Sequence, residues 1–278
     1  GSANTNNEMR FGYNLCNEAR RKILAFWNIY TFFVTYAVID NPDIAGYKIN
    51  YKNLNITDKW LLEKVNQFVA NADKAYDDNR QYDVVKDFEV LVDDISNFYI
   101  RANRKRFWKN SSTDQMDAYW CLYYAIKSLT QVMSPIIPFV TDHIWHNLVV
   151  SVEPNEAPSV HLSKFPTPLK DVNFGDIVGQ ADKAREVINL ALKLRNEYNL
   201  KVKQPLSALY VQGDDSYKDA VTAFKTIVLD ELNVKNIIFN ADNNKFNDVK
   251  IKLNFKEAGA VLKGEVNKIG RASCRERV

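Results

Sequence analysis

The chain has 278 residues, 46% hydrophobic and 26% charged, which is an ordinary globular composition with enough length for two domains. Its formal net charge of +3 excludes a uniformly basic protein, so any surface for nucleic acid must be a local patch. Three widely separated cysteines without a CxxC pair exclude a disulfide framework and a zinc knuckle, and they fit a reducing compartment. The polar N-terminus has no signal-peptide pattern, and no apolar run approaches the roughly 20 residues that span a bilayer. We therefore expect a cytoplasmic protein with no membrane partner.

Both ends of the chain look partly artificial. Gly1–Ser2 is typical of a cleavage scar, so we interpret residues 1–10 as a tag and leader. Residues 269–278 resemble a translated sequencing adapter, and we expect this tail to be non-native. Neither end is assigned a function.

The first half of the chain predicts an antiparallel helical bundle over residues 11–150. Apolar and aromatic residues recur at helical spacing in five segments, and short polar or proline-containing turns separate them. Short connections between helices favour antiparallel neighbours. The predicted helices run from about residue 8 or 14 to 39, from an N-cap at Thr57–Asp58, from about 84 to 102, from a cap at 111–114 to 133, and from 139 to 150.

The second half predicts a proline-bearing linker and a small α+β domain. Four prolines between Ser151 and Phe174 indicate an ordered linker, assigned to residues 151–180, that wraps over the bundle. We then expect a small α+β junction domain over residues 181–265. Its elements are a helix at 182–198 with Leu194 on its apolar face, strands at 206–211 and 234–239, a helix at 217–232, a strand at 249–255 and a short helix at 255–262. The predicted fold class is therefore mainly α, a helical bundle followed by a small α+β domain.

The end of the third predicted helix carries a basic and aromatic stripe. Its apolar stripe at residues 84, 88, 91, 95, 98 and 102 predicts the core face. Arg101, Arg104 and Trp108 continue a second stripe that starts at Asn97, roughly 125° away at 100° per residue, so they are expected to face solvent. Guanidinium groups neutralise phosphates and an exposed ring stacks on a base, a combination suited to unpaired nucleotides. Taken alone, this stretch more often has a purely structural role. Its cations would then complement the dipole at the end of the helix, and Trp108 would cover the end of the bundle.

The sequence contains none of the common catalytic motifs. There is no GxGxxG, GxxxxGK[ST], GxSxG or HExxH pattern. His143 and His146 lie three apart on a predicted helix, but no carboxylate or cysteine at inward helical spacing completes a zinc site. We expect no metal and no cofactor, which favours a binding module.

Several blocks follow one another in the order found in isoleucyl-tRNA synthetases. Residues 17–37 resemble the first helix after the catalytic core of that family, and Arg104–Lys–Arg–Phe–Trp108 is similar to its Arg-rich Phe–Trp signature. Met133–Ser–Pro–Ile–Ile–Pro138 and the following helix resemble the next part of the same bundle. Lys201–Val–Lys–Gln–Pro–Leu–Ser207 and Asp230–Glu–Leu–Asn–Val234 follow in the family's order. The resemblance covers roughly residues 11 to 265.

The resemblance implies the anticodon-binding bundle and C-terminal junction domain of an isoleucine–tRNA ligase. The catalytic and editing domains are absent from this chain, so we expect no ligase activity on its own and no pocket for ATP or isoleucine. The implied partners are the anticodon stem–loop of isoleucine tRNA and the parent enzyme's missing catalytic domain, with this chain a monomer. Alternatives are a valine-type synthetase fragment and a helical protein-interaction scaffold that does not bind RNA.

The resemblance also implies roles for individual residues. Trp108 is expected to meet anticodon bases, and Asn28 on the first helix is expected to read a base edge. Cationic side chains would hold phosphates or base edges of the anticodon loop, or add electrostatic attraction. These are Arg101, Arg104 and Arg106 for direct contact, and Lys105 and Lys109 for attraction.

Overall fold

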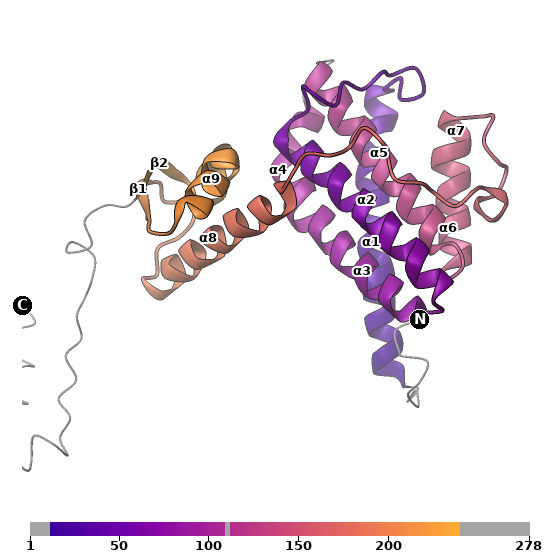
Figure 1. Ribbon diagram of the computed structural model, residues 1–278, viewed down its shortest axis with the longest axis horizontal. Helices are drawn as coiled ribbons and strands as arrows, with labels where there is room; N and C mark the ends of the chain where they lie inside the picture. The colour runs from indigo at the N-terminus through magenta and orange to yellow at the C-terminus, as the bar shows by residue number, and fades with distance from the viewer. Residues whose placement is uncertain (1–11, 109–111, 240–278) are drawn as a thin grey trace, which may run out of the picture.

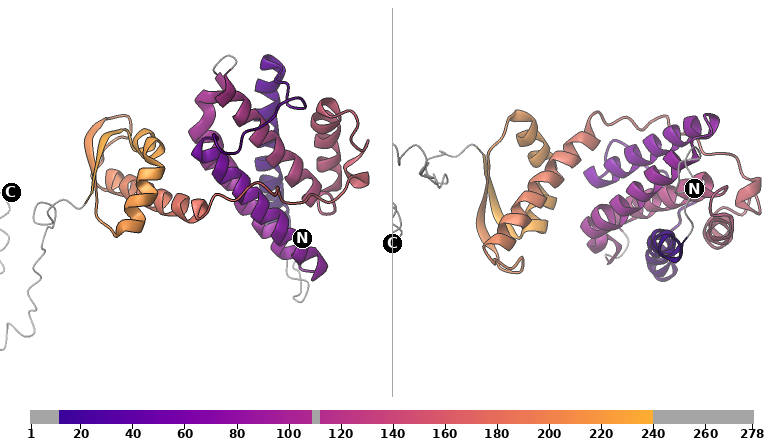
Figure 2. Two further views of the ribbon diagram at one scale, coloured as in Figure 1. Left: turned by 45° about the horizontal axis from the view of Figure 1, so that its top comes forward. Right: turned by 90° about the horizontal axis from the view of Figure 1, so that it is seen from below.

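The computed structural model describes residues 12–108 and 112–239, which form a helical bundle and a smaller α+β part (Figure 1). The two parts lie beside each other and are joined through one long helix, α8, as Figure 2 shows. This arrangement confirms the predicted fold class. Lys109, the predicted strand at 249–255, the short helix at 255–262 and both ends lie outside the described residues.

Helix α1 (Tyr13–Asp40) ends where Asn41 adopts a left-handed conformation and donates its backbone N–H to the Ala37 carbonyl. Pro42 then prevents the helix from continuing. By length and composition alone α1 could cross a membrane, so the expectation that no segment would be long and apolar enough was wrong. Its buried aromatic face packs against α3 and α5, as in the core helix of a bundle.

Helix α2 (Ile56–Asp77) begins two residues earlier than predicted. The side chain of Asn55, not Thr57 or Asp58, is the N-cap and accepts a hydrogen bond from the Thr57 backbone N–H at 3.1 Å. Thr57 and Asp58 therefore lie in the first turn, where both are buried. This shift places a carboxylate inside the bundle.

The third helical segment changes its winding three times. Helix α3 (Gln81–Asp94) continues as a π-helical stretch, η1 (Ile95–Ile100), a short α4 (Arg101–Asn103) and a 3₁₀ turn, η2 (Arg104–Trp108). The predicted core stripe is confirmed, because positions 84, 88, 91, 95 and 98 are buried and 102 is half-buried. The final 3₁₀ turn is tighter than an α-helix and sets which side chains of η2 point inward.

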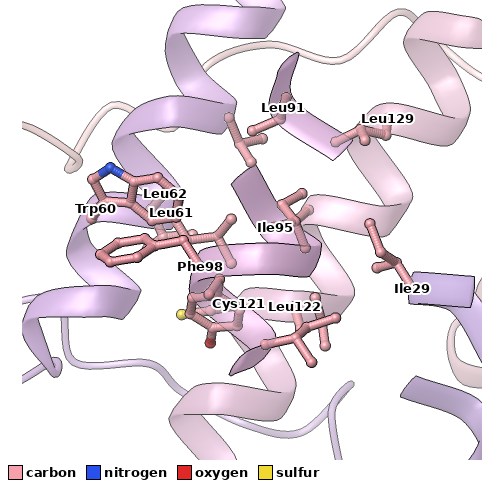
Figure 3. Packing of buried hydrophobic residues seen from close by; sticks show 14 of the residues in the cluster. Ile29, Trp60, Leu61, Leu62, Leu91, Ile95, Phe98, Cys121, Leu122 and Leu129 are labelled. Atoms are coloured by element: carbon pink, nitrogen blue, oxygen red, sulfur yellow. The ribbon is translucent and has the colours of Figure 1, made fainter. Parts of the chain in front are cut away.

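The remaining bundle helices follow the proline and capping signals. Helix α5 (Thr113–Met133) is capped by Ser112, whose hydroxyl accepts the Gln115 backbone N–H at 3.1 Å. After the Ser–Pro break, α6 (Pro138–Ile144), the π-helical η3 (Trp145–Val149) and α7 (Val150–Val152) form the predicted fifth helix. Figure 3 shows leucine and isoleucine side chains of α2, α3, η1 and α5 packed into one core.

The linker between α7 and α8 is ordered and crosses the bundle, as predicted (Figure 1). It contains one 3₁₀ turn, η4 (Val160–Leu162). The Trp145 indole N–H donates to the Ala157 carbonyl at 2.7 Å. Asn66 of α2 donates to the Leu169 carbonyl and accepts the Leu169 backbone N–H, each at 2.9 Å. The Asn66 side-chain amide thus pairs with both backbone groups of Leu169, as a neighbouring strand would, and holds the linker on the bundle.

The smaller part is a parallel β–α–β unit packed on α8 (Ile177–Glu197). Strands β1 (Leu206–Val211) and β2 (Val234–Phe239) have the predicted bounds, with Leu206 opposite Val234. The crossover that parallel strands require is made by α9 (Asp215–Ala223) and α10 (Lys225–Leu232). The single predicted helix is therefore two, because the chain bends at Phe224, whose buried ring packs against Phe98 of the bundle. Leu194, predicted on the apolar face of α8, is 54% exposed.

We expect Asn66→Ala to lower the free energy of unfolding by about 2 kcal/mol, since it removes two hydrogen bonds and leaves backbone groups unpaired. Gln131→Ala is the control, because Gln131 makes one exposed hydrogen bond to the same linker. It should cost under about 0.5 kcal/mol. Urea unfolding measures both, and equal losses would contradict the role assigned to Asn66.

Candidate nucleic-acid interface

The side chains of α4 and η2 divide into an inner and an outer set. Arg101, Arg104 and Lys105 are exposed, and Trp108 is 58% exposed. The interpretation that Trp108 continues the solvent-facing stripe is therefore confirmed. Lys109 lies outside the described residues.

Arg106 is buried, which contradicts its predicted role in holding RNA. Its guanidinium forms a bidentate ion pair with Asp58 of α2, with N···O distances of 2.9 and 2.6 Å. It also donates to the Asn103 side chain at 2.9 Å and to the Asp114 carbonyl at 2.7 Å. A guanidinium with these partners is a structural group, since a phosphate would have to displace a buried carboxylate.

Arg106 and Tyr99, which both donate to Asp58, stay protonated at neutral pH. Burial disfavours the charged form of Arg106, but its hydrogen bond to Asp58 and their attraction outweigh this and raise the pKa of the guanidinium. Burial, reinforced by the Asp58 charge, raises the pKa of the Tyr99 hydroxyl, which donates to Asp58 at 2.6 Å. The carboxylate therefore keeps both of its donors at neutral pH.

Aromatic packing fixes the orientation of the two last residues of η2. The buried ring of Phe107 meets Tyr119 edge-on at 5.0 Å and Phe32 of α1 edge-on at 5.2 Å, measured between ring centroids. With Phe107 inside, Trp108 lies at the surface, where its indole N–H donates to the Tyr36 hydroxyl at 2.9 Å. The indole is thus tethered to α1 by its edge, and its only hydrogen-bond donor is occupied.

Asn28 lies on the same flank of α1 as this tether. It is exposed, and Asn28, Phe32 and Tyr36 follow at four-residue steps, which places them along one face of the helix. Eight residues correspond to roughly 12 Å along a helix axis. Trp27, one position away, packs instead against Tyr30 and the His143 ring. Asn28 and Trp108 therefore lie along one flank of α1, and the exposed Arg104 lies four residues before Trp108 in η2; we call these three residues the RNA face.

Two predicted site residues turn toward the smaller part. Arg101 pairs with Glu231 at 2.5 Å, and Lys105 lies 3.8 Å from Asp230. A cavity of about 470 Å³ lies between the bundle and the smaller part. It is bounded by α4 and η2 on one side and by α10 on the other. Among the described residues no carboxylate pairs with Arg104.

No cluster for a metal ion occurs within residues 12–108 and 112–239, where no three His, Cys, Asp or Glu side chains gather. His143 faces Trp27, and His146 lies 3.5 Å from Asp142. Sequence reasoning also missed Tyr36, although its four-residue spacing from Phe32 and eight-residue spacing from Asn28 could have indicated it. No spacing in the sequence indicated that Asp230 and Glu231 of α10 would pair with Lys105 and Arg101.

We expect Arg106→Ala to destabilise the fold by about 3–5 kcal/mol, because Asp58 would remain buried without its cation. Arg104→Ala is the matched control and should change the free energy of unfolding by less than about 0.5 kcal/mol. Denaturant unfolding followed by circular dichroism measures both. Little change in Arg106→Ala would show that the Asp58 pair does not hold η2.

The chain is similar to a known domain family and to known isoleucine–tRNA ligases. A family model described as the anticodon-binding domain of tRNA ligase matches residues 58–210, from Asp58 in α2 into β1. The isoleucine–tRNA ligase of Clostridium novyi is 34% identical over 252 residues, which cover 90% of this chain and 24% of the relative. That of Thermus thermophilus is 34% identical over 276 residues, covering 97% and 26%. The chain thus spans about a quarter of the length of these relatives, and it belongs to the family of anticodon-binding domains of tRNA ligases.

Proposed function

We propose that this chain binds the anticodon stem–loop of isoleucine tRNA through the RNA face. The observation that carries the proposal is the exposed indole of Trp108 in the same short helix as Arg104, which pairs with no carboxylate among the described residues, in a chain of this family. The names of the relatives support isoleucine tRNA as the substrate. The same relatives support a place in the cytoplasm as part of an isoleucine–tRNA ligase.

Three side chains would each make a different kind of contact with the RNA. Trp108 offers a face for base stacking, a contact that tolerates any base. Because its N–H is held by Tyr36, the indole does not read a base edge by hydrogen bonding. Asn28 has an amide with both donors and an acceptor, which suits an edge contact. Arg104 supplies an exposed guanidinium for phosphate.

The chain binds as a monomer and ligates nothing by itself. The sequence has no nucleotide-binding or acyl-transfer motif, and the matched region is a quarter of each relative. Catalysis would belong to the catalytic domain of the parent ligase, with which this chain is expected to associate. A ligation assay on the purified chain with ATP, isoleucine and tRNA should give no charged product, and a charged product would contradict this part of the proposal.

Direct titration tests the proposed substrate. The chain should bind an isoleucine anticodon stem–loop more tightly than a stem–loop of the same length with an unrelated anticodon, at moderate salt. Equal affinities would leave only phosphate attraction. A tighter complex with a valine stem–loop would indicate the valine-type enzyme, and no retained RNA would favour a protein-interaction scaffold.

Trp108→Ala should weaken binding of the isoleucine stem–loop by about fivefold or more, because a stacked base contributes about 1–3 kcal/mol. Trp108→Phe keeps a ring and should lose less. Lys105→Ala should weaken both stem–loops equally, since it removes only phosphate attraction. Fluorescence anisotropy of labelled RNA measures these changes, and circular dichroism checks the fold. A folded Trp108→Ala variant with unchanged affinity would exclude the indole from the interface.

A further inference from the structure

Two cations beside the RNA face are held by carboxylates of the other part of the chain. Arg101 pairs with Glu231 at 2.5 Å, and Lys105 lies 3.8 Å from Asp230. Asp230 and Glu231 are adjacent in α10, and both line the cavity whose opposite wall includes Arg101 and Lys105. We call these two residues the acidic pair.

Nothing within α10 itself favours negative charge at this position. The acidic pair lies in the last turn of the helix, where the helix dipole disfavours anions, and that turn carries no basic residue. The cations that compensate the acidic pair are therefore those across the cavity.

Arg101 and Glu231 form the stronger of the two contacts. The Glu231 side chain is 17% exposed and that of Arg101 is 59% exposed. Burial raises the pKa of the Glu231 carboxyl, and the attraction of Arg101 only partly offsets this. Lys105 and Asp230 are mostly exposed, so their attraction is weak.

A carboxylate and a phosphate present the same kind of group to a guanidinium. Both offer anionic oxygens that accept its N–H donors in one plane. An RNA phosphate that approaches the Nη2 group of Arg101 therefore competes with Glu231, and it also meets the repulsion of two carboxylates. Trp108 and Asn28 have no contact with the acidic pair among the described residues, so base stacking and edge contacts are unaffected.

We propose that the acidic pair is a built-in competitor that occupies Arg101 and Lys105 until RNA phosphates displace it. This inference rests on the proposed RNA binding. It lowers the affinity for every RNA by the same factor and leaves discrimination between anticodons unchanged. RNA binding is then coupled to loosening of the contact between α10 and the bundle.

Glu231→Gln tests the competitor, because it keeps the shape of the side chain and removes its charge. It should bind the isoleucine stem–loop and the unrelated stem–loop about two- to fivefold more tightly than wild type at low salt. The gain should shrink as salt rises. In an Arg101→Gln background, Glu231→Gln should give no gain.

Asp219→Asn is the matched control, since Asp219 is exposed on α9 and its loss changes the net charge equally. Equal effects of Asp219→Asn and Glu231→Gln, a gain that persists without Arg101, or weaker binding by a folded Glu231→Gln variant would each overturn the competitor. If wild type binds RNA and Glu231→Gln does not improve it, only this inference fails. If neither protein binds RNA, the proposed function fails as well.

Discussion

The RNA face depends on the buried ion pair between Asp58 and Arg106. The pair joins the first turn of α2 to the 3₁₀ turn that ends the third helical segment, 48 positions later in the sequence. Asn103 accepts a further hydrogen bond from Arg106, and Tyr99 donates one to Asp58. Because an unpaired buried charge is costly, the η2 backbone can adopt few conformations that keep Arg106 inside. With Arg106 and Phe107 fixed inward, Arg104, Lys105 and Trp108 of the same short helix face solvent.

One short run of basic and aromatic residues therefore has two functions. Arg106 and Phe107 hold the turn, through an ion pair and through edge-on aromatic contacts. Arg104 and Trp108 are exposed to solvent, and Tyr36 of α1 accepts a hydrogen bond that restrains the indole. A pre-oriented ring loses little conformational freedom when a base stacks on it, which favours affinity. The packing that fixes Arg106 and Phe107 in the interior is thus also what leaves Arg104 and Trp108 exposed to a ligand.

Much of this fold followed from sequence periodicity. The apolar stripe of the third helix, the proline breaks and the two strands are local patterns, and the structure has them at or near the predicted residues. Arg106 could not be assigned correctly, because a basic residue at a helix end looks solvated until Asp58 is known to face it. The bend at Phe224 and the pairing of Arg101 with Glu231 likewise depend on contacts between parts far apart in sequence. The exposure of Trp108 was predictable, since it continues a polar stripe.

If the RNA face is the binding site, a base of the RNA stacks on the exposed indole of Trp108. Fluorine NMR of the 5-fluorotryptophan-labelled chain, titrated with the isoleucine anticodon stem–loop, tests it directly. The resonance of Trp108, assigned with the Trp108→Phe variant, should shift as RNA is added. Those of Trp60 and Trp145, whose side chains are buried, should stay in place. Saturable RNA binding with an unmoved Trp108 resonance would show that RNA binds elsewhere on the chain.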